Sequence, residues 1–174
     1  MDSYTIIVFI FGVFTLFLLV ILFFINRLLS HKRLITNSLV AVYANIEARI
    51  DLIEEMKEFI EKNLEHEKSY LSKLQKIEDY LSEFLKKKPI FKNYDKNEKE
   101  FLHFTFLDKT YSKLKNNKEY QKLKNDAITN KDNLIYALDS YDKGVINYNN
   151  YKDQKFILII SKIFRFPNYD CYNK

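Results

Sequence analysis

Glycine, proline and cysteine are scarce in this 174-residue chain, and tryptophan is absent. Folds rich in turns, which include most β and α/β folds, need glycine and proline in their loops, so two of each favour an all-α fold. With only Gly12 and Gly144, the chain cannot form the glycine-rich loops that commonly bind nucleotide phosphates. The single cysteine, Cys171, excludes an internal disulfide and a cysteine-based zinc site, and it is typical of a reducing compartment.

No charged residue occurs from Tyr4 to Ile25, a run of 22 mostly apolar residues. As a helix this run would be about 33 Å long, which is enough to cross a hydrocarbon core of about 30 Å. It is longer and more aromatic than the apolar part of a cleaved signal peptide, and no small-residue cleavage site follows it. We therefore predict a transmembrane anchor at residues 4–25, preceded by a short outer tail at residues 1–3.

Positive charge is concentrated just after the apolar run, at Arg27, Lys32 and Arg33, whereas Asp2 is the only charged side chain before it. Basic residues favour the cytoplasmic side of a membrane. This asymmetry predicts a single-pass protein of the cytoplasmic membrane, with its amino terminus outside and its carboxyl-terminal domain in the cytoplasm. The same basic side chains attract anionic headgroups, so membrane lipid is one expected partner.

Apolar residues recur every three or four positions from Leu39 to Phe84, with Glu and Lys between them. This spacing is typical of an amphipathic helix, and no glycine or proline interrupts the chain between Asn26 and Leu85. We therefore expect the transmembrane helix to continue into one long helix that ends at the Lys86–Pro89 sequence.

The rest of the chain alternates polar and apolar segments. Because amphipathic helices cannot bury their apolar stripes alone, they are expected to pack together as an all-α, antiparallel bundle of long helices at residues 26–166, followed by a tail at 167–174. The segments expected after the first helix are a loop at 89–97, a short apolar segment at 98–115, a helix from about Lys118 to Lys155 with room for a kink at 130–133, and an apolar segment at 156–166.

The formal net charge is +5, which is mild for a chain that contains 28 Lys and Arg residues. Proteins that bind nucleic acids gather positive charge on one face and add aromatic residues on which bases stack. Here Lys and Glu alternate along most of the chain, as they do on solvated helix faces. We therefore expect no nucleic-acid partner and no small-molecule substrate.

Short motifs stand at both ends of the region after the apolar run. Asn26-x-Leu28-Leu29 follows the run directly, and Asp51-Leu52-Ile53 is followed, fifteen residues after Asp51, by His66-Glu67-Lys68. The later motifs are Glu119-Tyr120, Ile135-Tyr136-Ala137, Tyr141, Val145 and Tyr148-Asn149, then Phe164-Arg165-Phe166 and Tyr169. In order and spacing these motifs resemble those of the LemA family of bacterial single-pass membrane proteins, over about two thirds of the chain.

The chain departs from the LemA pattern at several positions. Glu54 stands where the family has a proline that bends the first helix, Gly144 where it has alanine, and Phe164-Arg165-Phe166 where it has Phe-Gly-Phe. The resemblance implies an antiparallel helical bundle on a membrane anchor, with a straighter first helix in this chain. It implies no reaction, because the family has no established catalytic chemistry to carry over.

His66 and Glu67 form the pair that most invites a metal site. A zinc-protease helix needs His-Glu-x-x-His, but Tyr70 stands at the second His position, and a di-iron bundle needs two Glu-x-x-His pairs, of which only Glu100–His103 is present. We therefore expect no catalytic residue, no metal and no cofactor, and a metal-dependent enzyme is the remote alternative. His66 and Glu67 are interpreted as part of helix packing or of a buried hydrogen-bond network.

Asp51 is a lone acid among apolar neighbours. It either accepts a hydrogen bond from a lysine or a tyrosine of the later helix, with Tyr136 and Tyr141 as candidates, or lies exposed on the polar face of its helix. The later helix also carries a row of tyrosines, which is either a patch that faces a partner or a boundary face with buried rings and hydrated hydroxyls. The members of this row and its neighbouring amide are Tyr136, Tyr141, Tyr148, Asn149 and Tyr151.

The segment 156–166, FILIISKIFRF, has two interpretations. It either caps the open end of the bundle or lies in the membrane interface, with Lys155, Lys162 and Arg165 at lipid phosphates. The predicted function is a membrane-anchored, non-enzymatic interaction or scaffold module that binds a protein partner or itself. The alternative is a protein that binds an anionic lipid surface through residues 27–33 and 156–166.

Overall fold

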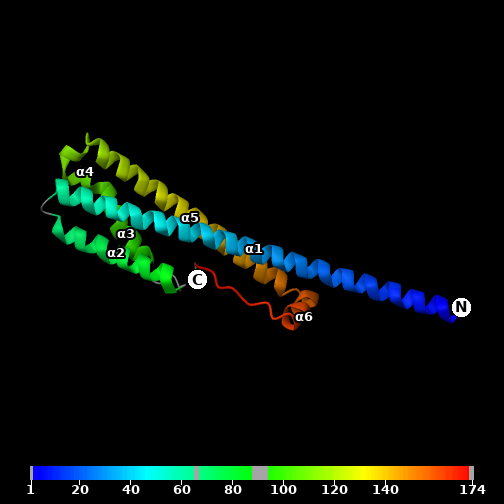
Figure 1. Cartoon of the computed structure of the whole chain (residues 1–174). Coiled ribbons are helices and arrows are strands. Elements are labelled where there is room, and N and C mark those ends of the chain that lie inside the picture. Colours follow the sequence, from blue (N-terminus) through cyan, green and yellow to red (C-terminus); the bar gives the residue numbers. More distant parts are fainter. Residues whose placement is uncertain (1, 65–66, 88–93, 173–174) are drawn as a thin grey trace. The chain divides into compact units, whose positions relative to one another are not determined.

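The longest element is α1, which runs from Ser3 to Asn63 in the computed structural model (Figure 1). The structure describes residues 2–64, 67–87 and 94–172. Near the amino terminus α1 contains an 18-residue window with a mean hydropathy of 3.3 in which no residue is buried. By length and composition, α1 is the one helix in the described residues that is long and apolar enough to cross a membrane.

The chain divides into two compact units, described here one at a time. The anchor unit comprises Met1–Ser38 and Ser140–Lys174, and the bundle unit comprises Leu39–Asp139. Both α1 and α5, which runs from Lys118 to Lys152, contribute residues to each unit.

In the anchor unit, α1 packs against α5 and against α6, which runs from Lys155 to Ile163. The buried side chains that these helices share are Leu28 and Ile35 from α1, Val145 and Tyr148 from α5, and Ile157 from α6. A Cβ atom added to Gly144 would lie 3.4 Å from Cγ1 of Ile35, which is ordinary van der Waals contact. The two helices therefore leave room for the alanine that the LemA pattern has at this position.

The bundle unit is built around aromatic rings from three elements. These are Phe59 on α1, Phe104 on the short helix η1 and Tyr120 on α5. Their ring centroids lie 5.3 to 6.1 Å apart, within the range at which aromatic pairs stabilise a core. The elements that follow α1 in this unit are α2 (Lys68–Lys87), α3 (Tyr94–Leu102), η1 (His103–Phe106), α4 (Leu107–Thr110) and η2 (Ser112–Leu114), before α5 begins.

α1 and α5 run antiparallel within the bundle unit. Phe59, late in α1, contacts Tyr120 at the start of α5, whereas Asn45, earlier in α1, bonds to Asn130 further along α5. All the described elements are helical. The predicted all-α bundle of antiparallel helices is therefore confirmed.

The helix predicted to run unbroken as far as Leu85 is two helices, so that prediction was wrong. α1 ends at Asn63, whose side-chain amide donates to the carbonyl oxygen of Phe59 at 2.9 Å, and α2 begins at Lys68. Apolar residues have the same spacing whether one helix continues or the chain turns back and starts a second helix. Periodicity alone therefore did not reveal the break. Folding back places the ring of Phe84 on α2 6.3 Å from that of Tyr43 on α1.

The polar stretch at 130–133 does not interrupt α5, which is one helix from Lys118 to Lys152. Asn130 is buried, and its side chain donates to the carbonyl of Asn45 at 2.9 Å and accepts from Nε of Arg49 at 2.7 Å. A polar residue in the apolar stripe is thus a link to α1, since a buried amide must have partners. α5 also ends at Lys152, three residues before the predicted end at Lys155.

The predicted loop at 89–97 was wrong for residues 94–97, which belong to α3. The remaining residues, 89–93, lie outside the described part of the chain. The apolar segment predicted at 98–115 contains the end of α3 and then short helical turns, separated by an extended residue, Tyr111.

Arg49 is a buried cation, with 2% of its surface exposed. It forms an ion pair with Glu98, and its guanidinium lies 4.4 Å from the ring centroid of Phe101, so it joins α3 to α1 as well as to Asn130 on α5. Removing one partner of such a pair leaves the other charge poorly solvated, which typically costs about 3 kcal/mol or more.

We predict that Arg49→Met lowers the free energy of unfolding of the full chain in detergent by about 3 kcal/mol, because Glu98 would lose its cation. Urea unfolding followed by circular dichroism measures this loss. The control is Lys131→Met, whose ammonium lies 3.7 Å from the exposed Asp132 carboxylate and should contribute under about 1 kcal/mol. Equal losses in the two variants would contradict the role assigned to Arg49.

Candidate functional site

The face of α5 that carries Tyr141, Tyr148 and Asn149 binds the carboxyl-terminal end of the chain, drawn in red in Figure 1. Residues 166–172, named here the strap, follow α6 without helical structure. The hydroxyl of Tyr148 donates to the carbonyl of Pro167 at 3.0 Å, and the side-chain amide of Asn149 donates to that of Tyr169 at 2.8 Å. The hydroxyl of Tyr141 donates to the carbonyl of Asp170 at 3.2 Å.

The spacing of these donors explains why they act together. Residues seven and eight positions apart lie on the same side of an α-helix, so Tyr141, Tyr148 and Asn149 share one face of α5. A fourth contact comes from the backbone amide of Tyr172, which donates to the carboxylate of Asp142. Because all four contacts involve the strap's main chain, the face recognises an extended backbone more than particular side chains.

Tyr148 is the centre of the site. Its side chain is fully buried and its ring packs edge-on against that of Tyr169, with centroids 5.1 Å apart. Burial raises the pKa of Tyr148 to about 12. The hydroxyl therefore keeps its proton, and its hydrogen bond to the strap, across the physiological pH range.

The tyrosine row does not form one exposed patch. Tyr148 is buried and Tyr141 and Tyr151 are half-buried, as expected for a boundary face, whereas Tyr136 in the bundle unit is 74% exposed. The residue type alone could not distinguish the buried tyrosines from the exposed one, because tyrosine is common in both buried and exposed positions.

Asp51 is exposed, and it lines an open polar groove of about 290 Å³ between α1 and α5 with Asp126 and Asn133. Tyr141, one of its two candidate tyrosine donors, bonds instead to Asp170. Of the two alternatives for Asp51, the structure therefore shows the solvated acid.

Glu67 is half-buried and accepts a hydrogen bond from the hydroxyl of Tyr111 at 2.7 Å. The carboxylate raises the pKa of Tyr111 because it stabilises the protonated phenol. This contact agrees with the hydrogen-bond interpretation of Glu67, while His66 lies outside the described residues. Within residues 2–64, 67–87 and 94–172, no group of three or more His, Cys, Asp or Glu side chains is placed to hold a metal ion.

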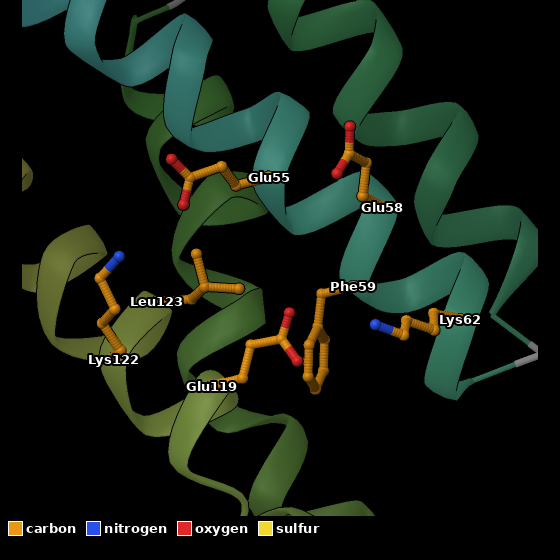
Figure 2. Close-up of a pocket in the computed structure, with 7 residues that line it drawn as sticks. All are labelled: Glu55, Glu58, Phe59, Lys62, Glu119, Lys122 and Leu123. Atoms are coloured by element: carbon orange, nitrogen blue, oxygen red, sulfur yellow. The ribbon is translucent and has the colours of Figure 1, made fainter.

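A second open hollow, of about 280 Å³, lies between α1 and α5 in the bundle unit (Figure 2). Phe59 and Leu123 contribute its apolar surface. The charged residues that surround it are Glu55, Glu58 and Lys62 from α1 and Glu119 and Lys122 from α5. Its charges are mixed in sign and lie on flexible side chains, so the hollow offers neither a nucleophile paired with a base nor an anion site.

The basic residues predicted to flank the membrane, Arg27, Lys32 and Arg33, are all exposed in the anchor unit. The guanidinium of Arg27 lies 5.4 Å from the ring centroid of Tyr151, within the range of a cation–π contact. The ring of His31 lies 5.2 Å from the same tyrosine. The end of α5 is therefore held beside the first turns of α1 that follow the apolar run.

The family model of the LemA family matches residues 38–174, which is most of the chain. The chain belongs to the LemA family. No curated protein and no solved structure matched it. The matched region contains Tyr141, Tyr148 and Asn149 as well as the strap, so the whole site lies in the part of the chain that this LemA protein shares with its family.

Arg165 connects α6 to the strap in a left-handed backbone conformation, with φ of 53°. An L residue with a side chain is strained there, whereas glycine is not. The Phe-Gly-Phe of the LemA pattern has its glycine at this position. The left-handed turn into the strap therefore gives a physical reason for a glycine there, and this chain has arginine at the turn.

We predict that Tyr148→Phe and Asn149→Ala each speed the reaction of Cys171 with a thiol reagent about fivefold, because each removes a hydrogen bond to the strap that contributes about 1 kcal/mol. Cys171 is the only cysteine, is half-buried and packs against the anchor-unit cluster, so its labelling rate reports detachment of the strap. Tyr136→Phe, on an exposed side chain, is the matched control. Equal rates in all the variants would show that these donors do not hold the strap.

We further predict that Arg165→Gly raises the free energy of unfolding by about 0.5–1 kcal/mol, because glycine removes the strain of the left-handed turn. Arg165→Ala removes the same charge but keeps a Cβ atom, so it should give no such gain. Urea unfolding of both variants separates strain from charge. A gain of the same size with alanine would assign the effect to charge.

Proposed function

We infer that this LemA protein is a single-pass membrane protein whose helical bundle acts by binding other proteins close to the membrane surface. The observation that carries the anchoring part is the exposure of the apolar run, since no residue of the 18-residue window of α1 is buried. A helix of a water-soluble protein keeps a polar stripe, and a helix that is apolar all round needs an apolar surrounding. A bilayer supplies that surrounding at the length observed.

The proposed orientation in the membrane rests on the basic residues that follow the apolar run. Arg27, Lys32 and Arg33 are exposed just after the apolar run, where their charged ends are placed to meet headgroup phosphates. The proposed arrangement has the amino terminus outside and both the bundle unit and the strap in the cytoplasm.

A binding role fits the bundle unit better than a catalytic one. Its buried polar residues, such as Arg49 and Asn130, hold helices together, and the two hollows described above are open grooves with solvated charges. On the outer side of α5, however, Ile128, Ile135 and Tyr136 expose apolar surface. Ile128 and Ile135 are seven residues apart and so lie on one face, which makes them suited to a protein partner or a second copy.

Anchoring is tested by extracting membranes that contain the full chain with alkaline carbonate, which releases peripheral proteins. We expect the chain to stay in the membrane fraction. A variant with three charges in the run, Phe11→Lys, Phe14→Lys and Leu18→Lys, should lose this retention, since each charge at mid-membrane is unfavourable. Release of the unchanged chain by carbonate would overturn the anchor.

The binding role is tested by placing a photoreactive residue at Tyr136 in intact cells. A discrete adduct is expected from this position and not from Glu54, an exposed position on α1 that serves as the control. A product of twice the chain mass would identify self-association, and a larger or smaller one a different partner. Identical patterns from the two positions would contradict a specific surface at Tyr136.

A further inference from the structure

α6, which is nine residues long, exposes an apolar face. One side packs inward, where Ile157 and Ser161 are buried. On the other side Phe156 is 80%, Ile159 61% and Ile163 68% exposed. These three positions are spaced by three and four residues, so they form one continuous apolar face.

Basic side chains border this face. Lys155 and Lys162 lie along one edge of α6 by helical spacing, and Arg165 follows its carboxyl end, where Phe164 is also exposed. All three cations are exposed. An apolar face bordered by cations is the pattern of a helix that lies in the plane of an anionic membrane surface.

The anchor unit holds α6 at the level where α1 leaves its apolar run. Ile157 shares a buried cluster with Leu28, and Phe24, the second-last residue of the run, packs against the same cluster. α6 also begins four residues after Tyr151, which contacts Arg27 and His31. At 1.5 Å per residue, Leu28 lies only about 5 Å beyond the run, within the headgroup layer of a bilayer.

We propose that α6 is a second membrane contact, which lies in the interface of the bilayer that α1 spans. Phe156, Ile159 and Ile163 enter the boundary between headgroups and acyl chains, and Lys155, Lys162 and Arg165 bind anionic lipid phosphates. The inference rests on the proposed anchoring by α1, because that anchor sets the depth of α6. A helix in the plane of the membrane would also fix the rotation of α1 about its own axis.

The absence of tryptophan from the chain gives a direct test. Full-length protein with the single substitution Phe156→Trp is reconstituted into vesicles of phosphatidylcholine, brominated on its acyl chains, and phosphatidylglycerol. Bromine quenches tryptophan only within the bilayer, so we expect Phe156→Trp to lose at least about half of its emission relative to unbrominated vesicles. Phe156 is exposed, so the substitution does not disturb the buried cluster.

Two further single-tryptophan proteins separate the possible failures. Phe14→Trp, inside the apolar run, should be quenched if α1 is in the bilayer, and Tyr136→Trp, in the bundle unit, should not be quenched. Quenching at position 14 without quenching at position 156 overturns the role of α6 and leaves the anchor standing. No quenching at position 14 overturns the anchor itself. Blue-shifted, unquenched emission from position 156 would show that protein covers this face, which also overturns the proposal.

The proposed binding of Lys155 and Lys162 to anionic lipid is tested separately. Lys155→Glu with Lys162→Glu, in the Phe156→Trp background, should reduce the quenching about twofold or more in vesicles that contain phosphatidylglycerol, because like charges repel. The matched variant Lys76→Glu with Lys115→Glu changes the net charge equally at exposed positions of the bundle unit and should leave quenching unchanged. Equal effects of the two pairs, or no effect of either, would overturn the assignment of these lysines to anionic lipid.

Discussion

The single stripe of buried side chains on α1 is the constraint on which the other elements depend. It begins at Leu28 and continues to Ile60, whereas the 18-residue apolar window near the amino terminus contains no buried residue. Four other helices contact this side of α1: α5 in both units, α2 and α3 in the bundle unit, and α6 in the anchor unit. The point at which α1 changes from apolar all round to one buried stripe therefore separates the segment for which we propose a lipid surrounding from the segment that protein covers.

Polar side chains set the register in which the other helices pack against α1. Apolar packing alone tolerates sliding between helices, whereas Arg49 meets Glu98 and Asn130 at one register only. In the anchor unit, Tyr141, Tyr148 and Asn149 do the same for the strap through its carbonyls. The strap contacts explain why a Tyr-Asn motif on one helix and an aromatic motif near the chain end occur together in the sequence: one binds the main chain of the other.

The fold class, the candidate membrane helix and the family follow from features that are local in the sequence, such as the run from Tyr4 to Ile25 and the Tyr148-Asn149 motif. The break between Asn63 and Lys68 does not, because it lacks glycine and proline and preserves the apolar spacing. Arg49 was not selected from the sequence either, since an arginine between apolar residues looks like any solvated helix position. Only its partners, 49 and 81 residues away, show that it is buried.

The two sequence interpretations of residues 156–166 were not exclusive, because a helix has two sides. Ile157 belongs to the anchor-unit core, while Phe156 and Ile159 point away from it. A helix with apolar residues on both sides would be an aggregation risk in water, since exposed apolar patches associate. Next to a membrane the same composition is stable, because the second side finds lipid. The cost of exposing Phe156 in water is therefore itself an argument for where α6 lies.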